Sequence, residues 1–155
     1  MMNDGRSHGL LAAIAPRFTR ELENVATEAL CYVIERSERA ERAFRSLIER
    51  TSGASFPEKL RWHTQSGGED RAIPDVVGED PAGRPRVIIE AKFWAELTSN
   101  QPATYLERLR DGDEGGVLLF VVPNVRLEVL WQEIRRACPV DVALGSDEIR
   151  RTETR

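Results

Sequence analysis

The segment from Pro74 to Lys92 constrains the fold more than any other part of the chain. Two apolar, β-branched runs flank a turn at 78–85 that contains two glycines and two prolines. A turn of this kind between such runs predicts a β-hairpin of two antiparallel strands. Because side chains two positions apart share one face of a strand, Glu90 and Lys92 should lie side by side, with Asp75 on the partner strand.

The polar residues of this hairpin carry a resemblance to a known family. Pro-Asp at positions 74 and 75, a gap of fourteen residues and then Glu-Ala-Lys at 90–92 resembles the signature of the PD-(D/E)XK nuclease superfamily. In that superfamily the two acidic residues hold one or two Mg²⁺ ions, and the lysine positions or activates the attacking water. The resemblance therefore implies that Asp75 and Glu90 bind metal and that Lys92 assists hydrolysis.

Two further features extend the resemblance. Gln101, nine residues after Lys92, and Tyr105 are similar to a Gln-x-x-x-Tyr element found in some branches of the superfamily. The two lie one turn apart on a predicted helix, so both are candidates for contacting a DNA phosphate or a base. Glu28 lies on an early predicted helix, where such enzymes often carry an acidic residue, and is a candidate additional metal ligand.

The residue types suit hydrolysis of a phosphodiester. The diester anion repels hydroxide and its alkoxide is a poor leaving group, so a hydrolase must neutralise charge and supply a nucleophile. Carboxylate and carbonyl oxygens suit Mg²⁺ or Mn²⁺, and the predicted ligands are Asp75, Glu90 and the backbone carbonyl of Ala91. Lys92 would orient the water or stabilise developing charge. We therefore predict a Mg²⁺-dependent deoxyribonuclease.

Simpler interpretations of the same residues remain open. An acidic residue and a lysine on one strand often form an ion pair on a solvated face. Glu28 is equally compatible with a solvated helix surface, and Tyr105 with ordinary packing against the sheet. A different functional class is a catalytically inactive module of the same fold that binds nucleic acid or a protein partner.

Composition limits how such a protein would bind DNA. The chain has 155 residues, a size typical of one domain, and a net charge of −4. It is therefore not a polycation that binds nucleic acid non-specifically. DNA contact would come from local groups, from a second copy in a homodimer, or from a larger multi-domain assembly such as a defence or repair system.

The remaining composition predicts a cytoplasmic protein with no membrane segment. Cys31 and Cys138 are too few for a disulfide framework or a cysteine metal cluster. The apolar run at 10–15 is at the short limit for the core of a signal peptide, and acidic and basic residues are mixed before it. No run approaches the length of about 18 apolar residues that a membrane helix needs.

Periodicity predicts a single α/β domain over residues 1–155, with flexible ends at 1–15 and 147–155. Two N-terminal helices precede a β-meander, and helices then alternate with strands. This order predicts an α/β/α sandwich around a central mixed sheet. The predicted helices are 16–36, 37–53, 100–110 and 125–137, and the predicted strands are 59–65, 74–77, 87–92, 117–122 and 140–144.

Three local predictions follow from side-chain type. The six apolar residues at 117–122 predict a strand buried on both faces and therefore central in the sheet. Ser37 predicts the N-cap of the second helix. In that helix, Glu41 and Arg45 are four residues apart and are predicted to pair on a solvated outer face.

Overall fold

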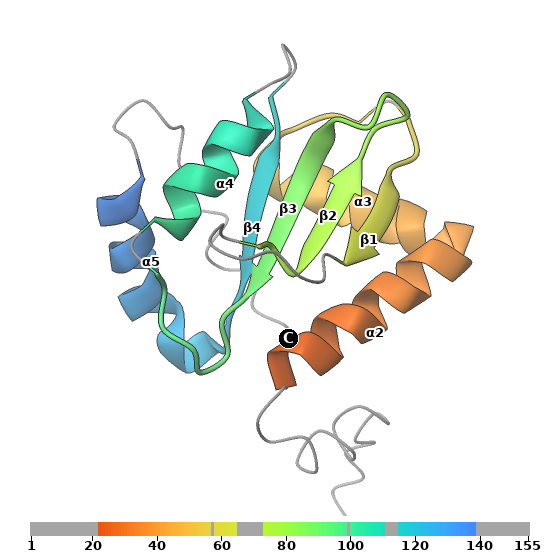
Figure 1. Cartoon of the computed structure of the whole chain (residues 1–155). Coiled ribbons are helices and arrows are strands. Elements are labelled where there is room, and N and C mark those ends of the chain that lie inside the picture. Colours follow the sequence, from red (N-terminus) through yellow and green to blue (C-terminus); the bar gives the residue numbers. More distant parts are fainter. Residues whose placement is uncertain (1–21, 57, 65–72, 99, 111–114, 139–155) are drawn as a thin grey trace, which may run out of the picture.

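The computed structural model describes residues 22–56, 58–64, 73–98, 100–110 and 115–138 (Figure 1). The predicted flexible ends and the predicted strand at 140–144 lie outside these residues. The described chain is a mixed α/β fold with the elements α2 (Leu22–Arg36), α3 (Glu38–Ser52), β1 (Arg61–Thr64), β2 (Val76–Glu79), β3 (Pro85–Ala91), α4 (Gln101–Leu109), β4 (Val117–Val121), the 3₁₀ helix η2 (Asn124–Arg126) and α5 (Leu127–Ala137).

The four strands form one mixed sheet in the order β1-β2-β3-β4. The β1–β2 and β2–β3 pairs are antiparallel, which confirms the predicted meander, whereas β3 and β4 are parallel. A parallel neighbour requires a crossover connection, and α4 lies in that connection. Val76 pairs with Ile89, so one further step along this register places Asp75 opposite Glu90.

The prediction that the strand at 117–122 is central is wrong for the described sheet. β4 is the outer strand there, and its residues are mostly half-buried. Its continuous apolar run has another cause, because Val117 and Leu119 pack into one apolar cluster while Leu118 packs into another. An outer strand with helices near both faces therefore has the apolar composition of a central one.

Two apolar clusters lie on opposite faces of the sheet. The larger cluster joins α2, α3 and the segment before β1 to one face, and the smaller joins α4 to the other. In Figure 1, α2 and α3 lie toward β1, whereas α4 and α5 lie toward β4. The larger cluster comprises Cys31, Ile34, Ile48, Phe56, Leu60, Trp62, Val76, Val87 and Ile89, and the smaller comprises Val77, Ile88, Tyr105 and Leu109.

The ends of α3 follow the predicted capping pattern, but one of its charged residues does not lie where predicted. Ser37 Oγ accepts a hydrogen bond of 3.2 Å from the N–H of Ala40, which confirms the N-cap. Glu41 pairs with Arg45 at 3.2 Å as expected, yet Glu41 is 1% exposed rather than on an outer face. The N–H of Leu60 also donates to it, at 3.4 Å. This carboxylate therefore joins α3 to the segment before β1.

The Gly78→Ala variant should be destabilised by about 1–3 kcal/mol, the usual cost of overpacking a core. A Cβ at Gly78 would lie 2.8 Å from Cζ3 of Trp62. That ring cannot easily move, because Trp62 is 2% exposed and packs edge-on against Phe44. Urea unfolding measures the loss. In a Trp62→Leu background the added cost of Gly78→Ala should nearly vanish, and an undiminished cost would contradict this packing.

The described helices also bear on the membrane prediction. None of them has both the length and the apolar composition that crossing a bilayer requires.

Candidate active site

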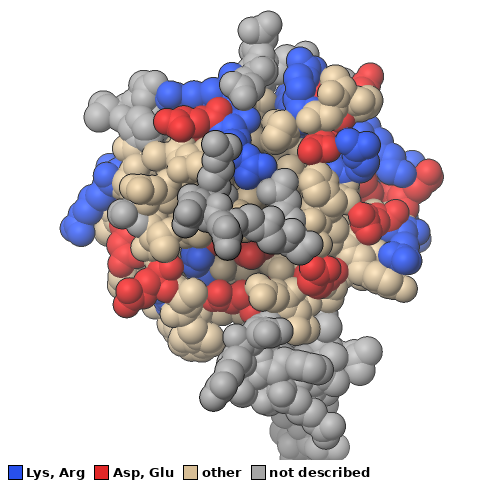
Figure 2. All heavy atoms as spheres, viewed as in Figure 1, with Lys and Arg blue, Asp and Glu red and all other residues tan. Residues whose placement is uncertain are grey.

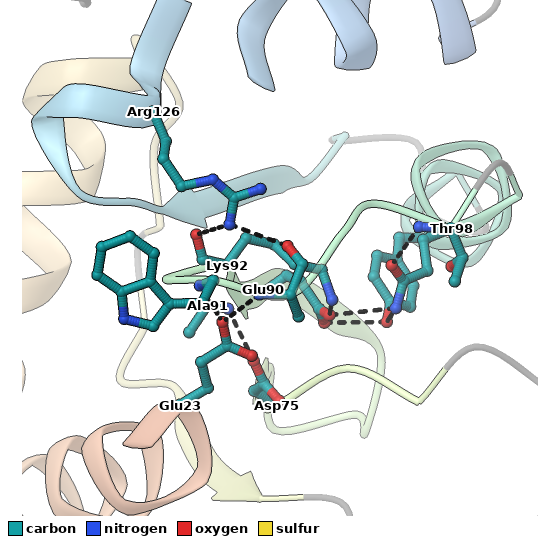
Figure 3. Close-up of polar contacts among 11 residues, drawn as sticks. Glu23, Asp75, Glu90, Ala91, Lys92, Thr98 and Arg126 are labelled. Carbon is teal, nitrogen blue, oxygen red and sulfur yellow. Dashed lines mark hydrogen bonds and ion pairs between the residues drawn. The ribbon is translucent and has the colours of Figure 1, made fainter. Parts of the chain in front are cut away.

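The predicted signature residues converge where β2 begins and β3 ends. Asp75 directly precedes β2, and Lys92 directly follows β3, whose last residues are Glu90 and Ala91. The N–H of Ala91 donates a 2.7 Å hydrogen bond to Asp75 Oδ2 (Figure 3). Lys92 Nζ lies 2.6 Å from Glu90 Oε1. The hairpin pairing therefore brings both carboxylates and the ammonium group into one cluster.

Glu90 is the centre of this cluster and is 3% exposed. Besides Lys92, its carboxylate accepts a 3.1 Å hydrogen bond at Oε1 from Gln101 Nε2 and a 3.0 Å bond at Oε2 from the hydroxyl of Tyr105. Gln101 and Tyr105 are four residues apart on α4, so both side chains project from one side of that helix toward the sheet. The Gln-x-x-x-Tyr element is thus joined to the Glu-Ala-Lys element by direct contacts.

Burial dominates the electrostatics of the two carboxylates. Burial raises the pKa of Glu90, the nearby charge of Asp75 raises it further, and the bonds from Lys92 and Tyr105 act in the opposite direction. Burial likewise raises the pKa of Asp75, against the effects of the Ala91 N–H and the Lys92 charge. Two partly desolvated carboxylates repel each other, and a cation bound between them would relieve this repulsion.

Tyr105 stays protonated in this setting. Its side chain is 0% exposed, and burial followed by the neighbouring Glu90 charge raises the pKa of its hydroxyl far above the usual range. The hydroxyl therefore acts as a hydrogen-bond donor that fixes the orientation of the Glu90 carboxylate. Ordinary apolar packing, the simpler interpretation of Tyr105, accounts for the ring but not for this bond.

Lys92 is held by its backbone as well as by its side chain. Its N–H donates to the carbonyl of Val121 at 2.9 Å, and its carbonyl accepts from Arg126 Nη1 at 3.3 Å. The same Arg126 nitrogen donates to the carbonyl of Ala95 at 3.0 Å. Arg126, which the sequence did not single out, therefore fixes the segment that follows β3.

α2 brings a second acidic residue, Glu23, to the segment that follows β3. The N–H groups of Trp94 and Ala95 donate to Glu23 Oε1 at 2.9 and 3.2 Å. Its charge is also among the causes that raise the pKa of Asp75, after burial. Glu23 is the first-turn acidic residue of α2, but a first-turn glutamate is common in helices and gave no signal of this role.

Glu28 lies elsewhere on α2. It is exposed, and its charge acts on Cys31, where burial and then the charges of Glu35 and Glu28 raise the pKa of the thiol to about 11. Glu28 follows Glu23 by five positions, which is well over one helical turn. A role for Glu28 in binding metal stays a prediction that no contact of the described residues supports.

The donor set of the cluster fits a hard divalent cation better than zinc. Among the described residues, no group of three or more His, Cys, Asp or Glu side chains is arranged to hold a metal ion. Mg²⁺, however, is usually held by one or two carboxylates together with waters and substrate phosphate oxygens. Asp75 and Glu90 supply such a pair, with the Ala91 carbonyl still a predicted third ligand. Their oxygens are the ligand type that Mg²⁺ and Mn²⁺ prefer.

The Asp75→Asn variant should be more stable than the wild type at pH 7, by up to about 1–2 kcal/mol. Because the pKa of Asp75 is raised in the folded state, the folded protein holds more of this proton than the unfolded chain does at pH values between the two pKa values. The free energy of unfolding thus falls as pH rises from the unfolded pKa through the folded pKa. Asn has no titrating carboxyl group, so its free energy of unfolding does not fall in this way, and its side-chain oxygen still accepts from the Ala91 N–H. Urea unfolding at pH 7 and near pH 4 measures the gain, which should shrink at the lower pH.

Asp80→Asn is the matched control for this substitution and should act in the opposite direction. The N–H of Arg84 and then the other donors of the turn lower the pKa of Asp80. Its ionised form therefore stabilises the fold above the unfolded pKa, and Asn should reduce stability at pH 7. Equal effects of the two substitutions at pH 7 would contradict the electrostatic difference between these carboxyls.

Residues from three helical elements contact the cluster at the end of β3 or the segment that follows it. Glu23 lies in α2, Tyr105 in α4 and Arg126 in η2. Each of these residues contacts Glu90 or the backbone between 92 and 95.

Comparison of the chain with protein-family models, with curated proteins and with solved structures finds no match.

Proposed function

We propose that this chain is a Mg²⁺- or Mn²⁺-dependent nuclease that hydrolyses DNA phosphodiester bonds. The observation that carries the proposal is the cluster at the open end of the hairpin, where buried Glu90 and Lys92 pair and half-buried Asp75 accepts from the N–H of Ala91 between them. We also propose that the whole chain forms an α/β/α sandwich of the restriction-endonuclease type. Helices against both faces of the described mixed sheet support that architecture.

The role of each residue follows from its contacts. Bound Mg²⁺ or Mn²⁺ would polarise the phosphate and lower the pKa of a coordinated water. Lys92, with its ammonium 2.6 Å from Glu90, is placed to orient that water or to stabilise negative charge on the phosphate. Tyr105 and Gln101 hold Glu90 in one orientation, and the Ala91 N–H does the same for Asp75.

The burial of the cluster argues against a surface ion pair. Glu90 and Lys92 are 3% and 7% exposed, whereas a solvated pair on a strand keeps most of its exposure. Burying two charges costs more than a simple ion pair returns, so such pairs are weak evidence for a purely stabilising role. Strongly desolvated titratable groups beside a charged partner are characteristic of functional sites.

Surface charge is consistent with weak intrinsic affinity for DNA. Figure 2 shows basic and acidic side chains interspersed over the viewed face rather than gathered into one basic field. With a net charge of −4, the protein would take its DNA affinity from the site, from a homodimer or from a larger assembly. A cytoplasmic defence or repair system is the setting we propose for such a nuclease.

Incubation of the full chain with supercoiled and linear DNA tests the proposal. Cleavage is expected with Mg²⁺ or Mn²⁺ and should stop when EDTA removes the metal. An inactive nuclease-fold module would instead bind DNA or a protein without cutting DNA under any of these conditions. Persistent absence of cleavage, with RNA and single strands included as substrates, would therefore overturn the nuclease proposal.

A further inference from the structure

Trp94 lies two residues after Lys92, and its side chain faces solvent. It is 71% exposed, whereas Trp62 in the core is 2% exposed. Single exposed apolar residues are common on protein surfaces, so exposure alone does not mark a site. Trp94 differs from exposed Val125 of η2 and Val129 of α5 because it lies in the segment that leaves the carboxylate cluster.

The backbone that carries Trp94 is held by hydrogen bonds from two helical elements. Glu23 accepts from the N–H groups of Trp94 and Ala95. Arg126 donates to the carbonyls of Lys92 and Ala95. The residues on both sides of the indole are therefore fixed while the indole itself stays in water. An aromatic ring presented on a fixed backbone loses little conformational entropy when it binds a flat ligand.

We propose that Trp94 is a stacking platform for an unpaired or terminal nucleobase next to the bond that is cleaved. The inference rests on the proposed nuclease function, since that function places a phosphodiester at the neighbouring Asp75–Glu90 pair. Aromatic side chains bind exposed bases through their π faces with little regard to sequence. Paired bases inside a duplex hide these faces, so the preferred substrate is a single strand or a duplex end rather than an uninterrupted duplex.

Equilibrium binding of labelled oligonucleotides tests this platform. The probes are a labelled single strand and, as unlabelled competitor, a relaxed, covalently closed circular duplex that contains the same sequence. Binding is measured by fluorescence anisotropy with Ca²⁺ in place of Mg²⁺. The Trp94→Ala variant should bind the single strand about 5- to 150-fold more weakly than the wild type, the range measured for loss of one stacked base. Its affinity for the circular duplex should change little, and Trp94→Phe should restore most of the single-strand affinity.

Tyr32→Ala is the matched control, because Tyr32 is another exposed aromatic residue, 58% exposed, and lies on α2 with Arg36 stacked over its ring at 3.9 Å. Tyr32→Ala should leave single-strand affinity within about twofold of the wild type, a change well below the loss of affinity expected when one stacked base is lost. Unchanged single-strand binding by Trp94→Ala would overturn the inference, as would an equal loss for both probes. Loss of self-association without loss of oligonucleotide affinity would also overturn it, because Trp94 would then serve a protein interface.

Failure of this inference can be told apart from failure of the nuclease proposal. If the wild type cleaves DNA, Glu90→Gln does not, and Trp94→Ala binds the single strand as the wild type does, only the platform is overturned. If the wild type neither binds nor cleaves any of the probes, both are overturned. Cleavage by the wild type, together with selective loss of single-strand binding in Trp94→Ala, supports both proposals.

Discussion

The Glu90→Gln variant is expected to lose metal-dependent DNA cleavage by more than about 100-fold, the upper end of what substitutions outside the direct ligands cost. Gln keeps the shape of Glu90 and an oxygen for the donors Lys92 and Gln101. What it removes is the negative charge that a divalent cation requires. The fold should therefore survive while the activity does not. Initial cleavage rates on supercoiled DNA, with thermal unfolding as a check of the fold, measure both.

Glu79→Gln provides the matched control for Glu90→Gln. Glu79 ends β2 at the opposite end from Asp75, and it pairs with Arg61 at 2.8 Å. Its substitution removes one carboxylate from the same sheet without touching the cluster, so cleavage should stay close to the wild-type rate. Cleavage by Glu90→Gln at the rate of Glu79→Gln would contradict a catalytic role for Glu90.

Lys92→Met should separate catalysis from metal binding. Loss of the ammonium group is expected to lower the cleavage rate about 10²- to 10³-fold, as removal of one group that stabilises developing charge does in other hydrolases. Metal affinity should be retained or increased, because the positive charge of Lys92 opposes a cation beside Glu90. Single-turnover cleavage at saturating metal, compared with metal titration of the same variant, measures the two effects.

Lys59→Met is the control for this change, since Lys59 is the other lysine of the chain. It is exposed and lies 3.9 Å from Glu38 on the surface. Its substitution should alter neither cleavage nor metal affinity. A Lys92→Met variant that cleaves normally, or one that loses metal affinity together with cleavage, would contradict the separate roles proposed for Lys92 and Glu90.

The part of the fold nearest the site could be predicted because its signals are local. The glycines and prolines at 78–85 predicted the antiparallel hairpin, and the alternation of a strand placed Glu90 and Lys92 on one face. The turn itself is shorter than predicted, because Gly78 and Glu79 belong to β2 and Pro85 belongs to β3. Ser37 capped its helix as its side chain favours. The four-residue spacing of Gln101 and Tyr105 likewise placed both on one side of α4, although only the structure joins them to Glu90.

What could not be predicted depends on contacts between distant segments. Glu23 and Glu28 are both helix glutamates, and only the angle at which α2 meets the sheet decides which one reaches the segment after β3. Arg126 donates to the carbonyl of Ala95 in that segment, although the two residues are 31 positions apart in the sequence. Glu41 was expected in water because of its charge, yet Arg45 and the Leu60 N–H satisfy it in the interior. Local patterning carries no information on these tertiary partners.

Calorimetric titration of Mn²⁺ into the wild type, Glu90→Gln and Lys92→Met tests most directly whether the carboxylate pair holds a divalent cation. We expect a saturable binding heat for the wild type and for Lys92→Met, and its loss in Glu90→Gln. Binding by Glu90→Gln with the wild-type affinity would contradict the account, because the cation would then lie elsewhere. Absence of binding to the wild type, even with an oligonucleotide present, would contradict it as well.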